Sequence, residues 1–337
     1  MAGHSSKELV RRLFRSDDLW RVPFIPWVCS FAARLQQIQT AAMLSDAGLL
    51  SRSLLDAQRL FNYDAIINVF EPTLEAEACG CRIDWRQDDG LPEVVSHPLA
   101  EGATAADLDV ANLETRGRLP AVLEATKRLV AIRGKEVAIL GVITGPISLA
   151  KHLRGDALLT ELNQGSQEAS SVIALAGNVG LKLCRTYCEL GVDAVVVAEG
   201  MLGQIQPNLY HVVAPSLRSI WNVARFYDVH SLILSKGCDR EHVEPTLGLQ
   251  ADGVALAGNL DDTQVRDAAL KRNCFYARSI PSAALLGTIP QVRSATLECL
   301  SAGSGAYFLS TEWEVPSATN VENFHEVMRV LEGHRNS

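Results

Sequence analysis

Residues 136–155 read EVAILGVITGPISLAKHLRG, and this stretch decides the fold that the sequence predicts. It opens with a mostly apolar run, residues 136–143, of the kind that forms a strand buried on both faces. A Gly-Pro turn follows, and beyond it the spacing of the apolar residues is helical. A buried strand that leads directly into a helix is the repeating unit of parallel α/β proteins.

The same unit recurs in both directions from this stretch. The candidate strands are residues 22–28, 65–70, 136–143, 194–198, 231–234, 253–257, 274–279 and 306–309. Because eight such units close into a barrel, we predict a single (β/α)8 TIM barrel, one α/β domain over residues 1–337. An open Rossmann-type sheet is the rival fold, but no GxGxxG turn follows any of these strands.

The segment 79–112 interrupts this alternation. It contains several glycines and prolines and is too long for a plain connection between a strand and a helix. We therefore expect a hairpin or a surface excursion after the second strand.

The composition is that of a soluble globular protein, with 47% hydrophobic and 21% charged residues. The net charge of -8 repels nucleic-acid phosphates and argues against DNA or RNA as a partner. The longest apolar run, at residues 137–143, is far shorter than the ~20 residues that a membrane-spanning helix needs. No apolar signal segment opens the chain, so we expect a cytoplasmic protein without a membrane partner.

The eight cysteines are expected to be reduced thiols rather than a disulfide framework. One residue separates Cys79 from Cys81, unlike the two of common zinc and redox motifs, and Cys184 and Cys188 lie four apart on a predicted helix. Since a free cysteine behaves as a small hydrophobe, we expect both pairs to pack in the interior.

Polar residues that directly follow the strands of such a barrel face the substrate. The residues that meet this criterion are Arg34, Glu71, His152, Glu199, Ser235, Lys236, Cys238, Asn259, Asp261, Glu312 and Glu314.

Several of these candidates also have purely structural explanations. Arg34 either anchors an anionic substrate or pairs with a carboxylate on a neighbouring helix. Glu71 precedes a proline and either acts on the substrate or caps the next helix. His152 lies near a helix start, where surface histidines are common. Cys238 with His242 four residues later is a weak metal signal.

Several stretches resemble one family, in the same order and spacing across nearly the whole chain. They read RVPFIPWVCSFAARL (21–35), FEPTLEAEACGCRIDW (70–85) followed by LPEV (91–94), GVITGPISLAKHLRG (141–155), LLGTIPQVRSATLECL (285–300) and YFLSTEWEVPSATNVENFHEVMRVL (307–331). The chain resembles the uroporphyrinogen decarboxylase superfamily, and its EAEACGC segment is more similar to the corrinoid-dependent methyltransferases than to the decarboxylases proper. The resemblance implies a (β/α)8 barrel and the transfer of a methyl group from methylcobalamin to a thiol such as coenzyme M.

Uroporphyrinogen decarboxylation itself is disfavoured, because the chain departs from the decarboxylases at a substrate-binding stretch. The decarboxylases hold substrate carboxylates with the arginines of an R-Q-A-G-R stretch after the first strand, whereas residues 30–34 (SFAAR) keep only Arg34. Loss of one charge-assisted pair costs about 1.5–3 kcal/mol. Glu71 stands at the position of the family's catalytic aspartate, and His152 at that of a tyrosine in the third-strand loop.

The resemblance also implies a zinc site, whose ligands this chain lacks at the expected positions. The methyltransferases hold zinc with a His-x-Cys pair at the end of the fifth strand and a cysteine after the eighth. Zinc converts a thiol into the nucleophilic thiolate. Here Ser235 and Gly237 stand at the first two positions, and Trp313 or Glu312 at the third. The candidates for a rebuilt metal site are Cys238, Glu312, Glu314, His230 and His242, with Cys238, His242 and Glu314 as the set to test.

Three functions compete at this point. The first is a methyltransferase that acts on a methylated corrinoid (methylcobalamin), supplied by a partner corrinoid protein, and a small acceptor, without zinc. The second is a decarboxylase of uroporphyrinogen or a related porphyrinogen, and the third is a non-catalytic corrinoid- or tetrapyrrole-binding protein. For the first, the residues expected to handle protons are Glu71, His152 and Glu199. The residues expected to bind substrate are Arg34, Ser235, Lys236, Asp261 and Glu312.

Overall fold

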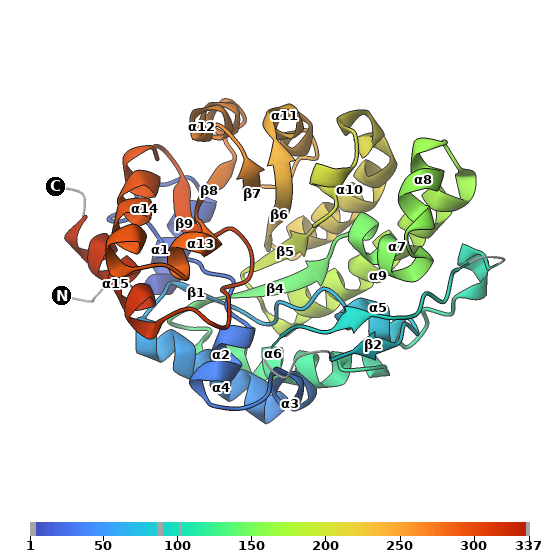
Figure 1. The fold of residues 1–337 in the computed structure, drawn as a ribbon, viewed down its shortest axis with the longest axis horizontal. Coiled ribbons are helices and arrows are strands. Elements are labelled where there is room, and N and C mark those ends of the chain that lie inside the picture. The colour runs from blue at the N-terminus through green and yellow to red at the C-terminus, as the bar shows by residue number, and fades with distance from the viewer. Residues whose placement is uncertain (1–4, 86–89, 101–102, 335–337) are drawn as a thin grey trace.

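The computed structural model describes residues 5–85, 90–100 and 103–334, which form an α/β barrel (Figure 1). Its main sheet has seven strands, all parallel, in the order β1-β4-β5-β6-β7-β8-β9. The strands are β1 (Ala65–Ile67), β4 (Ala138–Thr144), β5 (Ala194–Ala198), β6 (His230–Asp239), β7 (Gly253–Asn259), β8 (Phe275–Ile280) and β9 (Tyr307–Thr311). Both β4 and β5 are buried along their whole length, as expected of strands covered by helices on one side and by barrel side chains on the other.

Helices surround the curled sheet (Figure 1). They are α1 (Ser6–Phe14), α2 (Ser30–Leu35), α3 (Thr40–Ser45), α4 (Ala47–Phe61), α5 (Leu74–Ala78), α6 (Leu119–Arg133), α7 (Pro146–Arg154), α8 (Ala157–Asn163), α9 (Gln167–Leu190), α10 (Tyr210–Phe226), α11 (Val243–Leu247), α12 (Asp262–Lys271), α13 (Ser282–Leu285), α14 (Ile289–Ser301) and α15 (Val321–Gly333). At least one helix follows each strand of the main sheet, so the carboxyl ends of the strands meet at one rim.

The prediction of a first strand at residues 22–28 is wrong, because this segment is not a regular strand. Pro23 and Pro26 have no N–H group and cannot donate to a ladder. The segment instead makes two isolated parallel bridges with the last part of the barrel, Phe24 with Leu309 and Trp27 with Glu314. On its other side, the backbone N–H of Asp64, just before β1, donates to the carbonyl of Phe24 (2.9 Å). Residues 22–28 therefore fill the gap between β9 and β1.

The other seven predicted strands are confirmed, and β5 has the predicted bounds. The largest difference is in β6, which runs five residues past its predicted end at Leu234. A register shift between Ser235 and Cys238 lets the strand resume its pairing with β7 at Gly258 and Asn259. Ser235, Lys236 and Cys238 therefore lie within β6, not after it.

The excursion predicted after the second strand is confirmed as a small hairpin. Its strands β2 (Ile83–Asp84) and β3 (Glu93–Val94) pair antiparallel.

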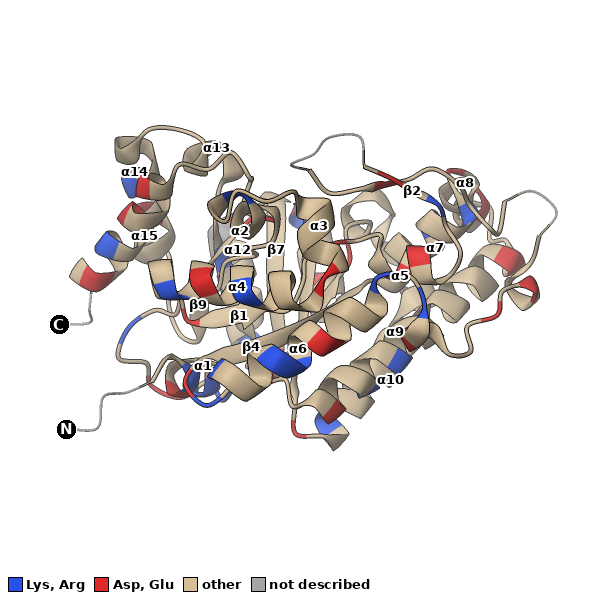
Figure 2. Ribbon diagram, turned by 90° about the horizontal axis from the view of Figure 1, so that it is seen from below, with Lys and Arg blue, Asp and Glu red and all other residues tan. Residues whose placement is uncertain are grey.

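Basic and acidic residues are interspersed along the ribbon shown in Figure 2. All eight cysteines are buried thiols, as the packing interpretation requires. Within the described part of the chain, no helix is long and apolar enough to cross a membrane.

Candidate active site

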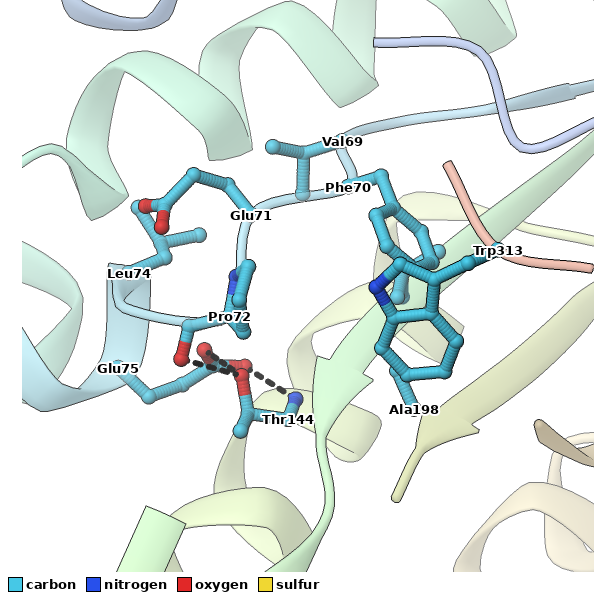
Figure 3. A pocket seen from close by; sticks show the side chains of 10 residues that line it. Val69, Phe70, Glu71, Pro72, Leu74, Glu75, Thr144, Ala198 and Trp313 are labelled. Carbon is cyan, nitrogen blue, oxygen red and sulfur yellow. Dashed lines mark hydrogen bonds between the residues drawn. The ribbon is translucent and has the colours of Figure 1, made fainter. Parts of the chain in front are cut away.

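A small pocket lies at the carboxyl ends of β1, β4 and β5 (Figure 3). Its lining residues are Val69, Phe70, Glu71, Pro72, Leu74, Glu75, Val142, Thr144, Ala198 and Trp313. The space open to the centre of a water-sized sphere is about 10 Å³, which is enough for about one water molecule. A larger ligand must therefore displace side chains or bind across the mouth.

Glu75, on α5, places a buried carboxyl group in the pocket wall. It is only 2% exposed, and it accepts hydrogen bonds from the backbone N–H (2.8 Å) and the hydroxyl (2.6 Å) of Thr144 (Figure 3). Burial raises the pKa of Glu75 to about 7, although the two bonds from Thr144 act to lower it. A carboxyl group with such a pKa can take up or release a proton at neutral pH.

Glu71, which follows β1, is also buried but is tied to a cation. Nη2 of Arg118 donates to its Oε2 (2.6 Å), and the backbone N–H of Thr73 donates to its Oε1 (2.7 Å). In Figure 3 the carboxylate turns away from Trp313. Burial raises the pKa of Glu71, and the Arg118 guanidinium acts in the opposite direction. Glu71 is therefore the less available of the two carboxylates.

Arg118 joins the pocket to the excursion. Its Nε donates to Glu77 on α5 (2.7 Å), and its guanidinium lies over the ring of Trp85, 5.1 Å from the centroid. Since Arg118 is only 7% exposed, these contacts hold the wall formed by Glu71 in place.

A third buried carboxyl group, Glu314, lies after β9. It accepts a hydrogen bond from the backbone N–H of Ser30 at the start of α2. Burial, with a smaller contribution from the charge of Glu71, raises the pKa of Glu314 to about 7. Glu71 also raises the pKa of Glu75. A negative charge on one of these carboxyl groups disfavours ionisation of the others. Glu75 and Glu314 are therefore partly protonated at neutral pH.

Two aromatic rings form the other side of the pocket. Trp313 and Phe70 meet edge to face, with their ring centroids 5.0 Å apart and an angle of 89° between the rings (Figure 3). They give the pocket one apolar side, opposite the carboxyl groups.

Glu199, which was predicted to handle protons, is hydrogen-bonded to the start of a helix. Its carboxylate accepts hydrogen bonds from the backbone N–H groups of Ile147 (2.8 Å) and Ser148 (3.0 Å) at the start of α7 and from the Ser148 hydroxyl (2.5 Å). The backbone N–H of Met201 donates to it as well (3.2 Å). It is fully buried and does not line the pocket. It therefore caps α7 from the neighbouring strand end.

His152, the other predicted proton carrier, lies on α7 and does not line the pocket either. Burial, together with the nearby His97 and Lys151, lowers the pKa of His152 to about 4. The imidazole is therefore neutral at pH 7. Its backbone carbonyl accepts hydrogen bonds from His97 Nδ1 (2.8 Å) and from the Cys81 thiol (3.4 Å), which attaches the excursion to α7.

Three of the predicted substrate-binding residues bind the chain itself. The guanidinium of Arg34 donates to the carbonyls of Ser317 (2.6 Å) and Thr319 (3.1 Å). Asp261 caps α12, and Glu312 accepts from the backbone N–H of Ser282 at the start of α13 (2.9 Å).

The remaining two substrate-binding candidates lie in β6. Ser235 is fully buried, and the thiol of Cys238 is 3.4 Å from its hydroxyl. Lys236 reaches the mouth, where its Nζ lies 4.6 Å from the centroid of the Trp313 ring.

Zinc does not fit the residues at the positions that the resemblance indicates. Neither Ser235 nor Gly237 supplies a thiolate or an imidazole, and nor does Trp313 or Glu312 at the third position.

The alternative metal set is not brought together either. A metal ion needs several His, Cys, Asp or Glu ligand atoms close together. Among the described residues, Asp239, Glu241 and His242 form such a group, with their ligand atoms within 4.8 Å of one another. Neither Cys238 nor Glu314 belongs to it. His242 is instead hydrogen-bonded to Asp239 (2.6 Å) and to the carbonyl of Ile205 (3.3 Å).

The comparisons with known proteins agree with this architecture. The family model described as uroporphyrinogen decarboxylase (URO-D) matches residues 5–334. The methylcobamide:CoM methyltransferase MtbA of Methanosarcina acetivorans is 22% identical over 345 residues, which cover 99% of this chain and 100% of that protein. The methylcobamide:CoM methyltransferase MtaA of Methanosarcina barkeri is 27% identical over 158 residues, 45% of this chain and 44% of that protein.

Solved structures show the same fold. A methyltransferase from Methanosarcina mazei superposes with a TM-score of 0.86 at 17% identity, covering 98% of this chain and 99% of its own. A B12-independent methionine synthase from Shewanella sp. W3-18-1 has a TM-score of 0.56 at 11% identity, over 86% of this chain and 87% of its own.

Proposed function

Because the chain belongs to the uroporphyrinogen decarboxylase (URO-D) family, we propose that it is a methyltransferase that moves a methyl group from a methylated corrinoid to a small acceptor without zinc. The similarity to a methylcobamide:CoM methyltransferase over 99% of the chain supports the reaction class. The single structural observation that carries the proposal is the buried Glu75 carboxyl group, with a pKa of about 7, in the wall of the pocket at the strand ends.

A thiol acceptor must lose its proton before it attacks a methyl group. The ordinary pKa of a thiol is about 8.5, so most of it is protonated at pH 7. Glu75 is partly ionised at that pH and can take the proton as a general base. Glu71 is bound to Arg118, and we assign to it the positioning of the pocket wall.

The methyl transfer needs only the thiol, the methylated corrinoid and Glu75. The thiol proton passes to the Glu75 carboxylate, and the sulfur forms a bond to the methyl carbon. The bond between carbon and cobalt breaks with both electrons left on the metal, so the corrinoid leaves in the cobalt(I) state. The next proton is released from Glu75 to solvent.

The small volume of the pocket also indicates how the corrinoid binds. About 10 Å³ of open space cannot hold a corrin ring, so we propose that the corrinoid docks across the mouth, delivered by a corrinoid protein. The acceptor then approaches Glu75 from the mouth.

Mixing the protein with methylcobalamin and 2-mercaptoethanesulfonate tests the proposal, because loss of the cobalt–methyl bond changes the visible spectrum. We expect Glu75→Gln to slow turnover about tenfold at pH 7. The difference should shrink towards pH 9, because the thiol then ionises without a base. The control is Glu298→Gln, which removes an exposed carboxylate from α14 and should leave turnover unchanged.

Two outcomes would contradict the proposal. Release of carbon dioxide from uroporphyrinogen, with no demethylation of methylcobalamin, would identify a decarboxylase. Saturable corrinoid binding without turnover of any thiol would identify a binding protein.

A further inference from the structure

The rim of the barrel presents a cation beside the pocket. Lys236 is solvent-exposed, and its ammonium lies over the indole of Trp313, which itself lines the pocket. An ammonium over an aromatic face is held by the ring quadrupole, a weak attraction that does not neutralise its charge.

The backbone of β6 determines where Lys236 points. The register between β6 and β7 shifts between Ser235 and Cys238, and Gly237 has a φ of +68°. A Cβ built on Gly203 would come within 2.3 Å of the Gly237 backbone, so the preceding loop packs directly on this irregularity. Irregularities of this kind at a barrel rim re-aim side chains. The position of Lys236 is therefore built into the fold.

Trp313 also packs against a second aromatic ring. The ring of Phe70 meets it at right angles, with the two centroids 5.0 Å apart. Residues that follow β1 and β9 thus form the surface on which Lys236 rests.

Among the side chains that the structure describes, no carboxylate oxygen lies within 4.0 Å of Lys236 Nζ. The carboxyl groups of the site are engaged elsewhere: Glu71 by Arg118, Glu75 by Thr144 and Glu314 by Ser30. The ammonium is consequently free to bind an incoming anion.

We propose that Lys236, seated on Trp313, binds the anionic sulfur of the methyl acceptor. The ammonium stabilises the thiolate over the thiol by direct electrostatic attraction, and the indole supplies an apolar surface for the polarisable sulfur. This role deepens the proposed function and rests on it. Anion binding at this position can be tested without turnover.

Thiocyanate is a suitable probe, since it is a compact anion with a terminal sulfur. It is titrated into the protein at constant ionic strength, without a corrinoid, and tryptophan fluorescence is followed. We expect saturable quenching that Trp313→Phe largely removes. We expect Lys236→Met to raise the Kd about tenfold, since a charge-assisted contact is lost, and Lys236→Arg to keep it within about threefold. The matched control is Lys135→Met, an exposed lysine between α6 and β4, which should bind as the wild type does.

Equal affinity in the wild type and Lys236→Met would overturn the inference. Lys236→Gln is a second neutral variant, and circular dichroism checks that both variants fold. If thiocyanate binds at Lys236 but no thiol is methylated, the anion site stands and the proposed function fails. If thiols are methylated equally well by Lys236→Met across the pH range, the function stands and the role of Lys236 is wrong.

Discussion

A single buried carboxyl group makes the stability of this protein depend on pH. Glu75 is 2% exposed, and burial raises its pKa from 4.5 to about 7. In the unfolded chain the group ionises near its ordinary value, so between about pH 4.5 and 7 the folded protein binds more protons than the unfolded chain. The free energy of unfolding therefore falls as the pH rises through this window.

Glu75→Gln should remove this part of the pH dependence. A difference of about 2.5 pKa units corresponds to roughly 3 kcal/mol, as an order of magnitude. We expect the wild type to lose stability between pH 5 and pH 8, and the variant to lose about 2–3 kcal/mol less. Urea unfolding at the two pH values measures both. Glu298→Gln, on the exposed face of α14, serves as the control. An identical pH dependence in the wild type and Glu75→Gln would show that Glu75 ionises normally in the folded protein.

Sequence reasoning placed Glu71 beside the second strand's end, and the structure has it in the pocket. Glu75 does not directly follow a strand, so the criterion that selects Glu71 does not select it, and its partner Thr144 lies 69 positions later in the chain. Arg118 lies 47 positions after Glu71, beyond the excursion. A local pattern could not reveal a contact that depends on how the excursion returns.

At the scale of elements, the strand ends use polar residues to hold helices. Glu199 satisfies two backbone N–H groups at the start of α7 and the hydroxyl of Ser148. The sequence criterion that selects polar residues after barrel strands cannot separate such a cap from a catalytic group, because both lie at the same rim. Glu312 shows the same ambiguity at the start of α13.

Glu199→Ala should destabilise the protein clearly. The change removes a helix cap, worth about 1 kcal/mol, and leaves buried donors without partners at about 1–3 kcal/mol each, so we expect a loss of roughly 3 kcal/mol. Urea unfolding gives the total, and faster hydrogen exchange at the amides of Ile147 and Ser148 would locate it. Asp156→Ala removes an exposed carboxylate between α7 and α8 that pairs with Lys151 of α7, and we expect little change. A loss as small as that of Asp156→Ala would mean that α7 does not depend on Glu199.

The bounds of a strand could be predicted where the burial of its residues alone determines them. The run at residues 194–198 is continuous, buried and β-branched, and its bounds are those of β5. The bounds of β6 depend on an irregularity that pairs Cys238 with Gly258, which no apolar pattern records. Residues 22–28 have the composition of a strand, yet Pro23 and Pro26 prevent a ladder. The barrel as a whole could be predicted, but not the way in which its two ends meet.

At the scale of the whole molecule, one carboxylate joins the segment that closes the barrel to the sheet. Asp64, fully buried just before β1, accepts a hydrogen bond from the backbone N–H of Phe24 (2.8 Å). It also binds both terminal nitrogens of Arg21 (2.7 and 2.5 Å) and the hydroxyl of Ser6 on α1 (2.8 Å). Since residues 22–28 lack a continuous ladder, these contacts supply much of the specific pairing between the first segment and β1.

Asp64→Asn should therefore weaken barrel closure. The amide keeps the shape of the side chain but leaves the Arg21 guanidinium, whose side chain is 15% exposed, without its counter-charge. Breaking a buried pair in this way costs about 3–5 kcal/mol, and urea unfolding should show a loss of that order. Asp109→Asn breaks an exposed pair with Arg116 and should change little. Hydrogen exchange at Ile25 and Leu309 provides the specific readout, because their backbone N–H groups make the bonds between the segment and β9. If those amides stay protected in Asp64→Asn while stability falls, the carboxylate supports only α1 and the barrel closes without it.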